Sequence, residues 1–303
     1  MRLMTFIRRA LPLIAAPILG VGGCAVLNGA GITVPQRSLE AQVQLIKNHV
    51  VTRLPENRAG PVPVVILFHG CGGRRPLQEF YADALTDAGY GVLIVDSAGA
   101  RDIGRTEALA SVCTAVRLWG QERAADVYAA VELARRHPDL DGETIALVGW
   151  SHGGWTALEA LAYAGERVRP PTFQDTIYTT PTLGGLGLVI GMYPYCSPPL
   201  RSEPAHWHRD VRVRMVLAGD DRIANPAHCR AKVDEARRLG LDAAYVEWPG
   251  LSHAFDDDKP GNWFMQYDAD AAHRARDHLV ALLDEWQGGP DDDASEPGIA
   301  LTP

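Results

Sequence analysis

Short apolar runs alternate along the chain with longer segments in which apolar residues recur at helical spacing. The runs are rich in valine, isoleucine and leucine and end in glycine, acidic or proline-containing loops, as buried strands do: 62–68, 92–96, 145–150, 188–193, 213–218 and 243–248. The helical segments are 78–88, 122–137, 153–164, 227–239 and 268–286. Strands that alternate with helices predict a mostly parallel sheet with helices on both faces, which is the α/β class.

The segments around this pattern are less regular. Residues 44–53 mix apolar and polar side chains near period two, which predicts an antiparallel strand at an edge of the sheet. Residues 170–186 are rich in proline, threonine and glycine without periodicity, so we expect a loop that could cap a binding site. On the helical segment 122–137 apolar residues supply the buried side, and we expect Glu122 and Arg123 to face outward or pair locally.

The N-terminal residues have the pattern of an export signal. Arginines precede an apolar stretch at 10–20 that contains two prolines and is too short to span a bilayer comfortably. The following VGGC resembles the lipobox of bacterial lipoproteins, in which the cysteine, here Cys24, is lipidated and becomes the new N-terminus. We therefore expect a lipoprotein-type signal peptide at 1–23 and a tether at 25–44. A soluble exported protein cleaved nearby and an uncleaved membrane anchor are the alternatives.

Length and charge limit the remaining possibilities. With 303 residues and 47% hydrophobic content, the chain can bury one large α/β core, which we place at 45–287. Residues 288–303 contain an acidic run, proline and glycine and predict a disordered tail. The formal net charge of -8 argues against nucleic acid or an anionic membrane surface as the main partner. A membrane would be contacted only through the N-terminal lipid.

The cysteines agree with export. Apart from the candidate lipidation site, four cysteines remain, an even number that allows two disulfides in three connectivities. We predict Cys71 with Cys113 and Cys196 with Cys229, because each pair would come from loops at the same end of neighbouring strands. Four free thiols are the alternative. None of the cysteines shows the close spacing of a zinc or redox site, so no metal is expected.

The segment from 145 to 163 carries the clearest chemical signal. An apolar strand runs into Ser151, which is followed by a helix, and glycines occupy positions 149 and 153. A serine held on a tight strand-to-helix turn needs small neighbours, because side chains there would collide with the adjoining strand and helix. The pattern therefore predicts a nucleophilic serine on a turn between a strand and a helix.

Three further loops follow predicted strands and carry groups that a serine nucleophile needs. HGCGG follows the strand at 62–68, and the amide of Cys71 with that of His152 could hold a developing oxyanion. GDDRI offers Asp220 or Asp221 to orient an imidazole, and we prefer Asp221, which stands two positions before an apolar residue. His253, before the last helix, could take the proton of the serine.

The order of these groups and the motifs around them resemble a known family. Serine, aspartate and histidine occur in the order of α/β-hydrolase triads. FHGCGG, DSAGARD, GWSHGG, YPYC, GDDRIANPAHC and WPGLSHAFD together resemble the dienelactone hydrolase family of the α/β-hydrolases over residues 45–285. The resemblance implies a single-domain hydrolase with Ser151, Asp221 and His253 as the triad and Cys71 and His152 as oxyanion donors. Dienelactone hydrolases proper use a cysteine nucleophile, so the serine favours esterase chemistry.

The sequence thus predicts an exported serine hydrolase, periplasmic or membrane-anchored, that cleaves small-molecule carboxylic esters or lactones through an acyl-enzyme. This chemistry requires neither a cofactor nor a metal. Arg101, in the DSAGARD loop, could bind a substrate carboxylate, and a structural ion pair with an acidic residue is the alternative. Two other classes remain: a peptidase or acyltransferase on the same fold, and a non-catalytic surface lipoprotein that acts as a binding module. The sequence predicts no oligomeric state.

Overall fold

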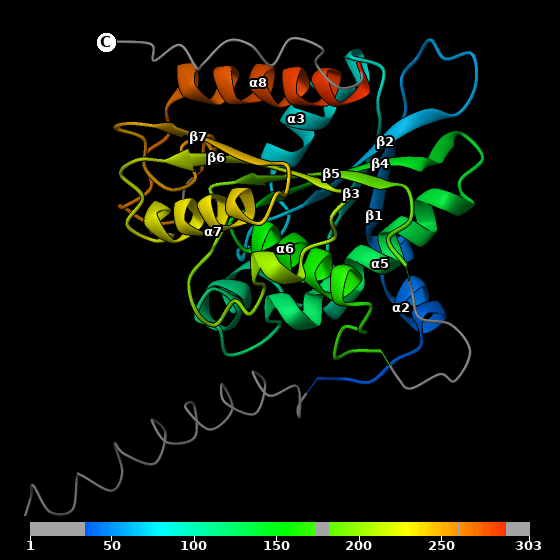
Figure 1. Ribbon diagram of the computed structural model, residues 1–303, viewed down its shortest axis with the longest axis horizontal. Helices are drawn as coiled ribbons and strands as arrows, with labels where there is room; N and C mark the ends of the chain where they lie inside the picture. Colours follow the sequence, from blue (N-terminus) through cyan, green and yellow to red (C-terminus); the bar gives the residue numbers. More distant parts are fainter. Residues whose placement is uncertain (1–33, 174–181, 260, 289–303) are drawn as a thin grey trace, which may run out of the picture.

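A twisted sheet forms the centre of the computed structural model, which describes residues 34–173, 182–259 and 261–288 (Figure 1). Within these ranges the sheet has seven strands in the order β1-β3-β2-β4-β5-β6-β7. All neighbouring strands are parallel except β1, which pairs antiparallel with β3 at the edge. The strands are β1 (Val50–Arg53), β2 (Val62–Phe68), β3 (Gly91–Val95), β4 (Leu140–Trp150), β5 (Leu186–Met192), β6 (Arg212–Ala218) and β7 (Ala243–Trp248).

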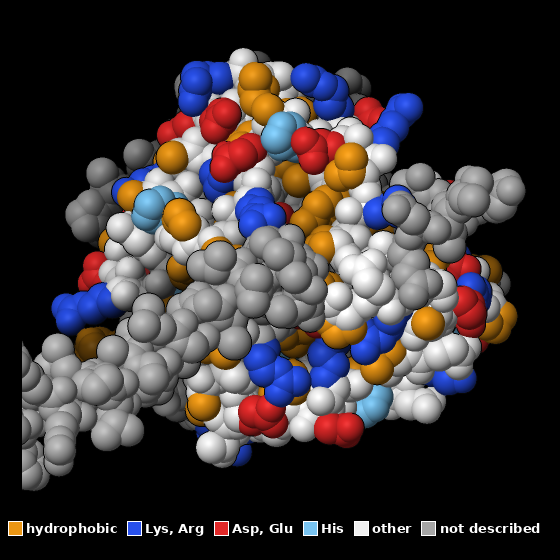
Figure 2. Space-filling model, turned by 90° about the horizontal axis from the view of Figure 1, so that it is seen from below, with side chains coloured by type: hydrophobic (Ala, Val, Ile, Leu, Met, Phe, Trp, Pro, Cys, Tyr) orange, Lys and Arg blue, Asp and Glu red, His pale blue; other side chains and the backbone are white. Residues whose placement is uncertain are grey.

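Helices cover both faces of this sheet, as the alternation of elements predicts (Figure 1). On one face lie α3 (Pro76–Asp87) and α8 (Ala269–Gln287), and on the other lie α2 (Leu39–Ile46), α5 (Gly120–Arg136), α6 (His152–Glu166) and α7 (Pro226–Arg238). A short α4 (Arg105–Glu107) continues into a π-helical turn, Ala108–Val112. No helix in the described ranges combines the length and apolarity that a bilayer crossing needs. Figure 2, seen from the side of α5 and α6, shows basic and acidic side chains mixed among hydrophobic ones.

Two hydrophobic cores lie on the two faces of the sheet, and alternate residues of each strand feed them. In β2, Val65 and Leu67 join the core under α3 and α8, while Ile66 and Phe68 join the core under α5 and α6. Because successive side chains of a strand point to opposite faces, a doubly covered parallel strand must be apolar throughout. This is why the short runs without polar alternation are central strands. The predicted α/β class is confirmed.

The beginning of the domain differs from its prediction. Residues 44–46 end helix α2 rather than begin a strand, and only Val50–Arg53 form the antiparallel edge strand. Ser38 caps this helix by accepting a hydrogen bond from an amide of its first turn. Val43 and Ile46 are buried against the core. The expected tether at 25–44 therefore ends where α2 begins, because residues 39–44 belong to a helix that packs on α5.

Several other predictions lie outside the described residues. These are the signal segment 1–23, the lipidation of Cys24, residues 25–33 of the tether, and the tail 288–303 apart from Gly288, the C-cap of α8. They stay predictions.

The loop at 170–186 does not cap the serine in its described parts. Phe173 packs its ring edge on Tyr128 of α5, with ring centroids 5.8 Å apart. The carbonyl of Gly185 accepts a hydrogen bond from the amide of Ile145, far along β4 from its carboxyl end. The Gly185 contact places residues 182–186 at the amino end of β5, whereas the Thr172 hydroxyl donates to the carbonyl of Glu122 in the first turn of α5 at 3.1 Å. None of the described residues of this loop lines a cavity that contains Ser151, so the described parts do not cap the serine.

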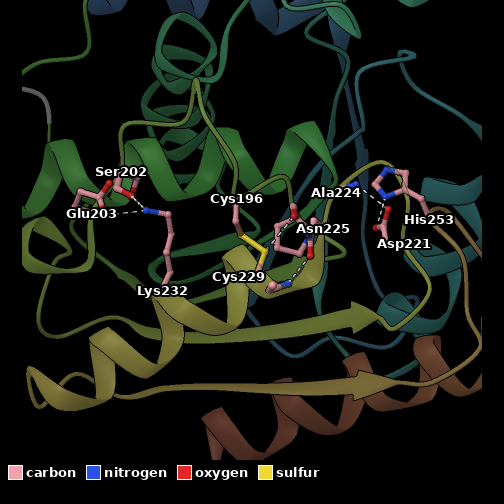
Figure 3. Close-up of a disulfide and its surroundings, with 11 residues drawn as sticks. Cys196, Ser202, Glu203, Asp221, Ala224, Asn225, Cys229, Lys232 and His253 are labelled. Carbon is pink, nitrogen blue, oxygen red and sulfur yellow. Dashed lines mark hydrogen bonds and ion pairs between the residues drawn. A yellow bond between two sulfur atoms is a disulfide. The ribbon is translucent and has the colours of Figure 1, made fainter.

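Both predicted disulfides are present. Cys71 and Cys113 join the loop after β2 to the segment that follows the π-helical turn, with 5.0 Å between their Cα atoms. Cys196 and Cys229 join the loop after β5 to the first turn of α7, with 5.2 Å between their Cα atoms (Figure 3). The prediction of two disulfides with this pairing is confirmed. Paired cysteines are typical of exported proteins, since cytosolic thiols are kept reduced.

Replacing Cys196 and Cys229 together by serine should lower the free energy of unfolding by about 4 kcal/mol, because the bridge closes a loop in the unfolded chain. Urea denaturation of the oxidised parent and of the double variant measures this difference, and the parent in reductant serves as a second control. Alkylation of all four thiols in the folded, unreduced parent would contradict the pairing.

Candidate active site

Ser151 sits on a sharp turn between the end of β4 and the first residue of α6. Its φ of 52° and ψ of -111° are strained for a residue with a side chain. A Cβ at Gly149 would lie 2.3 Å from the backbone of Gly153, and one at Gly153 would lie 2.1 Å from the carbonyl oxygen of Phe68. The turn therefore leaves no room for side chains at these glycines, which is the steric reason that the sequence pattern indicated.

The structure brings Ser151, His253 and Asp221 together from the carboxyl ends of β4, β7 and β6. Ser151 Oγ lies 2.9 Å from His253 Nε2. His253 Nδ1 lies 2.6 Å from Asp221 Oδ2 (Figure 3). The imidazole and the carboxylate are buried, with 3% and 8% of each residue exposed. Between the two candidate acids, Asp221 contacts the imidazole, whereas Asp220 is exposed to solvent.

Asp221 is held in place by its own loop. Its Oδ1 accepts hydrogen bonds from the amides of Ile223 at 2.8 Å and Ala224 at 2.7 Å, so Oδ2 is left to the imidazole. A carboxylate fixed in this way holds the histidine with its Nδ1 proton toward the acid and its Nε2 toward the serine.

A second buried carboxylate, Asp256, acts on the histidine indirectly, through the tyrosine that packs against the imidazole. It accepts hydrogen bonds from the hydroxyls of Tyr193 and Tyr81, both at 2.6 Å, and from Trp150 Nε1 at 3.3 Å. The ring of Tyr193 packs edge-on against His253, with centroids 4.9 Å apart. Burial raises the pKa of Asp256, and the two tyrosine hydroxyls lower it in part. Sequence reasoning missed this residue, although an acid directly after the apolar Phe255 was a signal.

Cys71 and His152 line a small cavity beside Ser151, as expected of oxyanion donors. His152 is the first residue of α6, and the amides of a first helical turn have no partner within the helix. Within the described ranges neither of the two amides donates a hydrogen bond to a protein acceptor. Two amides that lack a protein acceptor within these ranges thus belong to residues that line the cavity beside the serine.

Arg123 is fully buried. The expectation that this side chain faces outward from α5 is therefore wrong. Arg123 donates to the carbonyl of His69 at 2.8 Å and contacts His152 Nδ1 at 3.2 Å. Burial lowers the pKa of Arg123 to about 10. Burial, and then the charge of Arg123, lower the pKa values of His69 and His152. Both imidazoles are therefore neutral at neutral pH, and the arginine ties the loop after β2 to the start of α6.

The other candidate binder, Arg101, does not reach the serine. Its guanidinium makes two hydrogen bonds of 3.0 Å to the carboxylate of Asp126 on α5. Asp126 is fully buried, and Arg101 holds the pKa of this carboxyl below its usual range against the effect of burial. Of the two interpretations, the structural ion pair is the one observed. Glu122, expected to face outward, is also buried, with its carboxylate 3.9 Å from Arg101 Nε.

A mostly parallel sheet that carries a serine on a tight turn, then an aspartate and a histidine further along the chain, defines the α/β-hydrolase class. Among solved structures, a dienelactone hydrolase-like promiscuous phosphotriesterase from metagenomic libraries matches with a TM-score of 0.59 and 19% identity, over 78% of this chain and 92% of that chain. An esterase of Thermogutta terrifontis with propionate bound matches with a TM-score of 0.56 and 16% identity, over 79% and 88%. The chain has the α/β-hydrolase fold that these proteins share.

Sequence comparisons give a second set of relatives. The model of the prolyl oligopeptidase family matches residues 78–169, which contain Ser151 but neither partner of its triad. A protein of Emericella nidulans named "Probable dipeptidyl-aminopeptidase B" is 34% identical over 68% of this chain and 24% of its own length. Its counterpart in Fusarium vanettenii is 31% identical over 44% and 16%. The chain thus spans a quarter or less of the curated relatives that it matches.

Proposed function

We propose that this protein is a serine hydrolase that cleaves carboxylic esters or lactones through an acyl-enzyme. The hydrogen-bonded chain from Ser151 through His253 to Asp221 is the observation that carries the proposal. The fold shared with esterases and dienelactone hydrolase-like proteins supports it.

The proposed reaction has two halves. Ser151 Oγ attacks the carbonyl carbon while its proton moves to His253 Nε2, and Asp221 stabilises the imidazolium. The amides of Cys71 and His152 donate hydrogen bonds to the oxyanion. The imidazolium then protonates the departing alkoxide as the acyl–oxygen bond breaks, which leaves the acyl group on the serine. Water, deprotonated by His253, attacks this ester, and the acid departs as the serine regains its proton.

A peptidase is the second candidate, because the prolyl oligopeptidase model covers the serine segment and the curated relatives are named as aminopeptidases. An acyltransferase would use the same acyl-enzyme with an alcohol or amine in place of water. These activities share the triad and differ in what the cavities accept.

We also propose that the protein is exported and held at a membrane by a lipid on Cys24, so that it acts on small molecules in the periplasm. The two disulfides support export. Labelling with radioactive palmitate, compared with a Cys24→Ser variant, tests the anchor.

A fluorophosphonate probe and a substrate panel test the activity. We expect the probe to label Ser151, because a serine activated by a histidine attacks phosphorus as it attacks a carbonyl. The panel contains p-nitrophenyl acetate, a small lactone and alanyl-proline p-nitroanilide, and we expect the ester or the lactone to have the higher kcat/KM. A higher value for the anilide would favour the peptidase. A folded protein that is not labelled would favour the non-catalytic binding module.

A further inference from the structure

Two cavities of different size meet at Ser151. The smaller has a volume of about 90 Å³ and the larger about 430 Å³. Both are lined by Ser151, by the Cys71–Cys113 disulfide and by Ile223, so these residues lie at the boundary between the two cavities. A carbonyl carbon bonded to the serine would therefore have one substituent on each side.

The position of His253 assigns the two substituents. His253 lines the larger cavity and not the smaller one, whereas His152 lines only the smaller. The leaving oxygen must come within hydrogen-bond reach of His253 Nε2 to receive its proton. The leaving group therefore extends into the larger cavity, and the acyl group enters the smaller one.

From this geometry we infer that the enzyme selects esters with a short apolar acyl group and a bulky apolar alcohol, an inference that rests on the proposed function. A cavity of about 90 Å³ is smaller than the roughly 150 Å³ cavity that binds benzene in an engineered protein. An acyl chain of two to about four carbons fits this space, and a long chain or an aromatic ring does not.

The walls of the smaller cavity are apolar and firmly held. Val112 and Trp155 are buried, and Pro199 and the disulfide add rigid surface. The polar atoms of the two aromatic residues are already engaged: Trp155 Nε1 donates to Glu159 at 2.8 Å, and the Tyr195 hydroxyl donates to a backbone carbonyl at 2.9 Å. Because neither ring has a free hydrogen-bond donor, the two rings do not favour a polar acyl group. The close packing around the smaller cavity limits its expansion.

The larger cavity opens onto exposed apolar side chains. Leu109, Ile223 and Phe264 line it and are 38%, 37% and 39% exposed, which is unusual for large hydrophobic residues. Trp263, 76% exposed, stacks on Phe264 with centroids 3.7 Å apart and extends this apolar rim away from the serine. Arg75, also in the lining, is ion-paired with Asp257 at 3.3 Å, and the exposed Arg105 adds a polar edge. An aromatic alcohol would cover this rim.

Two series of esters separate the roles of the cavities. In the first, p-nitrophenyl acetate, butanoate and octanoate vary the acyl group at a constant leaving group. In the second, ethyl, benzyl and naphthylmethyl acetates vary the alcohol at a constant acyl group, with leaving groups of similar basicity. We expect kcat/KM to fall at least about tenfold from butanoate to octanoate, because misfit of a methylene group in a packed pocket costs about tenfold or more. We expect kcat/KM to rise from ethyl to naphthylmethyl acetate, because the larger apolar alcohol covers more of the rim.

Two variants with matched controls assign the effects to the cavities. Tyr195→Ala should enlarge the smaller cavity and raise the octanoate-to-acetate ratio at least about tenfold without changing the order of the alcohols. Phe264→Ala should remove the preference for naphthylmethyl acetate and leave the acyl profile unchanged. Tyr245→Ala, a half-buried tyrosine on β7, and Tyr267→Ala, an exposed aromatic that lines neither cavity, should change neither ratio.

The outcomes distinguish failure of this inference from failure of the proposed function. Equal kcat/KM for acetate and octanoate in a parent enzyme that the fluorophosphonate labels would overturn the inference and leave the hydrolase in place. An exchange of effects, with Tyr195→Ala altering the alcohol series, would overturn the assignment of the cavities. Absence of both labelling and ester turnover would remove the function itself. If Tyr195→Ala does not fold, the kcat/KM values of the parent for acetate, butanoate and octanoate still test whether the smaller cavity excludes long acyl chains.

Discussion

Replacement of Ser151 by alanine is expected to lower kcat for p-nitrophenyl acetate by about a millionfold. The hydroxyl is the atom that forms the acyl-enzyme, and no second hydroxyl in the described residues is hydrogen-bonded to His253. Oxyanion donors and binding alone leave only a small residual rate above water.

The fold should survive this substitution, because alanine removes one oxygen and keeps the Cβ that the turn already accommodates at φ 52°. Steady-state kinetics, circular dichroism and labelling of the same preparations provide the measurement. Ser38→Ala, at the cap of α2 and remote from the cavities, is the control and should keep the parent kcat. Activity of Ser151→Ala within a few-fold of the parent would exclude the serine as nucleophile.

Asparagine at position 221 should lower kcat by about ten-thousandfold. Oδ1 of Asp221 accepts the amides of Ile223 and Ala224, so an asparagine that keeps these bonds must turn its NH2 group toward His253. The imidazole would then accept at Nδ1 and carry its proton on Nε2, where it cannot take the proton of the serine. The substitution also removes the negative charge that stabilises the imidazolium, which lowers kcat further.

Asp220→Asn is the matched control, with the same chemical change one residue earlier. Its carboxylate is exposed, and its amide hydrogen bond to the carbonyl of Leu251 does not depend on the side chain. We expect kcat within a few-fold of the parent. Parallel pH profiles of the two variants complete the measurement. A larger loss in Asp220→Asn than in Asp221→Asn would reverse the assignment of the acid.

Much of the fold followed from periodicity. A run that is apolar at every position, Val62–Phe68, became a central strand with these same bounds, because a parallel strand covered on both faces has no solvent side. The pattern of apolar and polar residues failed to predict the secondary structure where contacts with distant segments decide which side chains are buried. Leu39–Ile46 is helical and packed on α5, although its end mixes apolar and polar residues in a way that also suits a strand.

For the site, the sequence alone determined the candidates Ser151 and His253 and the steric need for glycines around the serine. These are properties of short motifs placed in loops after strands. The tertiary structure alone placed Asp221 rather than Asp220 on the imidazole, buried Arg123 and Asp256 behind the reacting groups, and divided the space at the serine into two cavities. Each of these depends on side-chain directions and distances between segments far apart in the chain, and no local spacing encodes them.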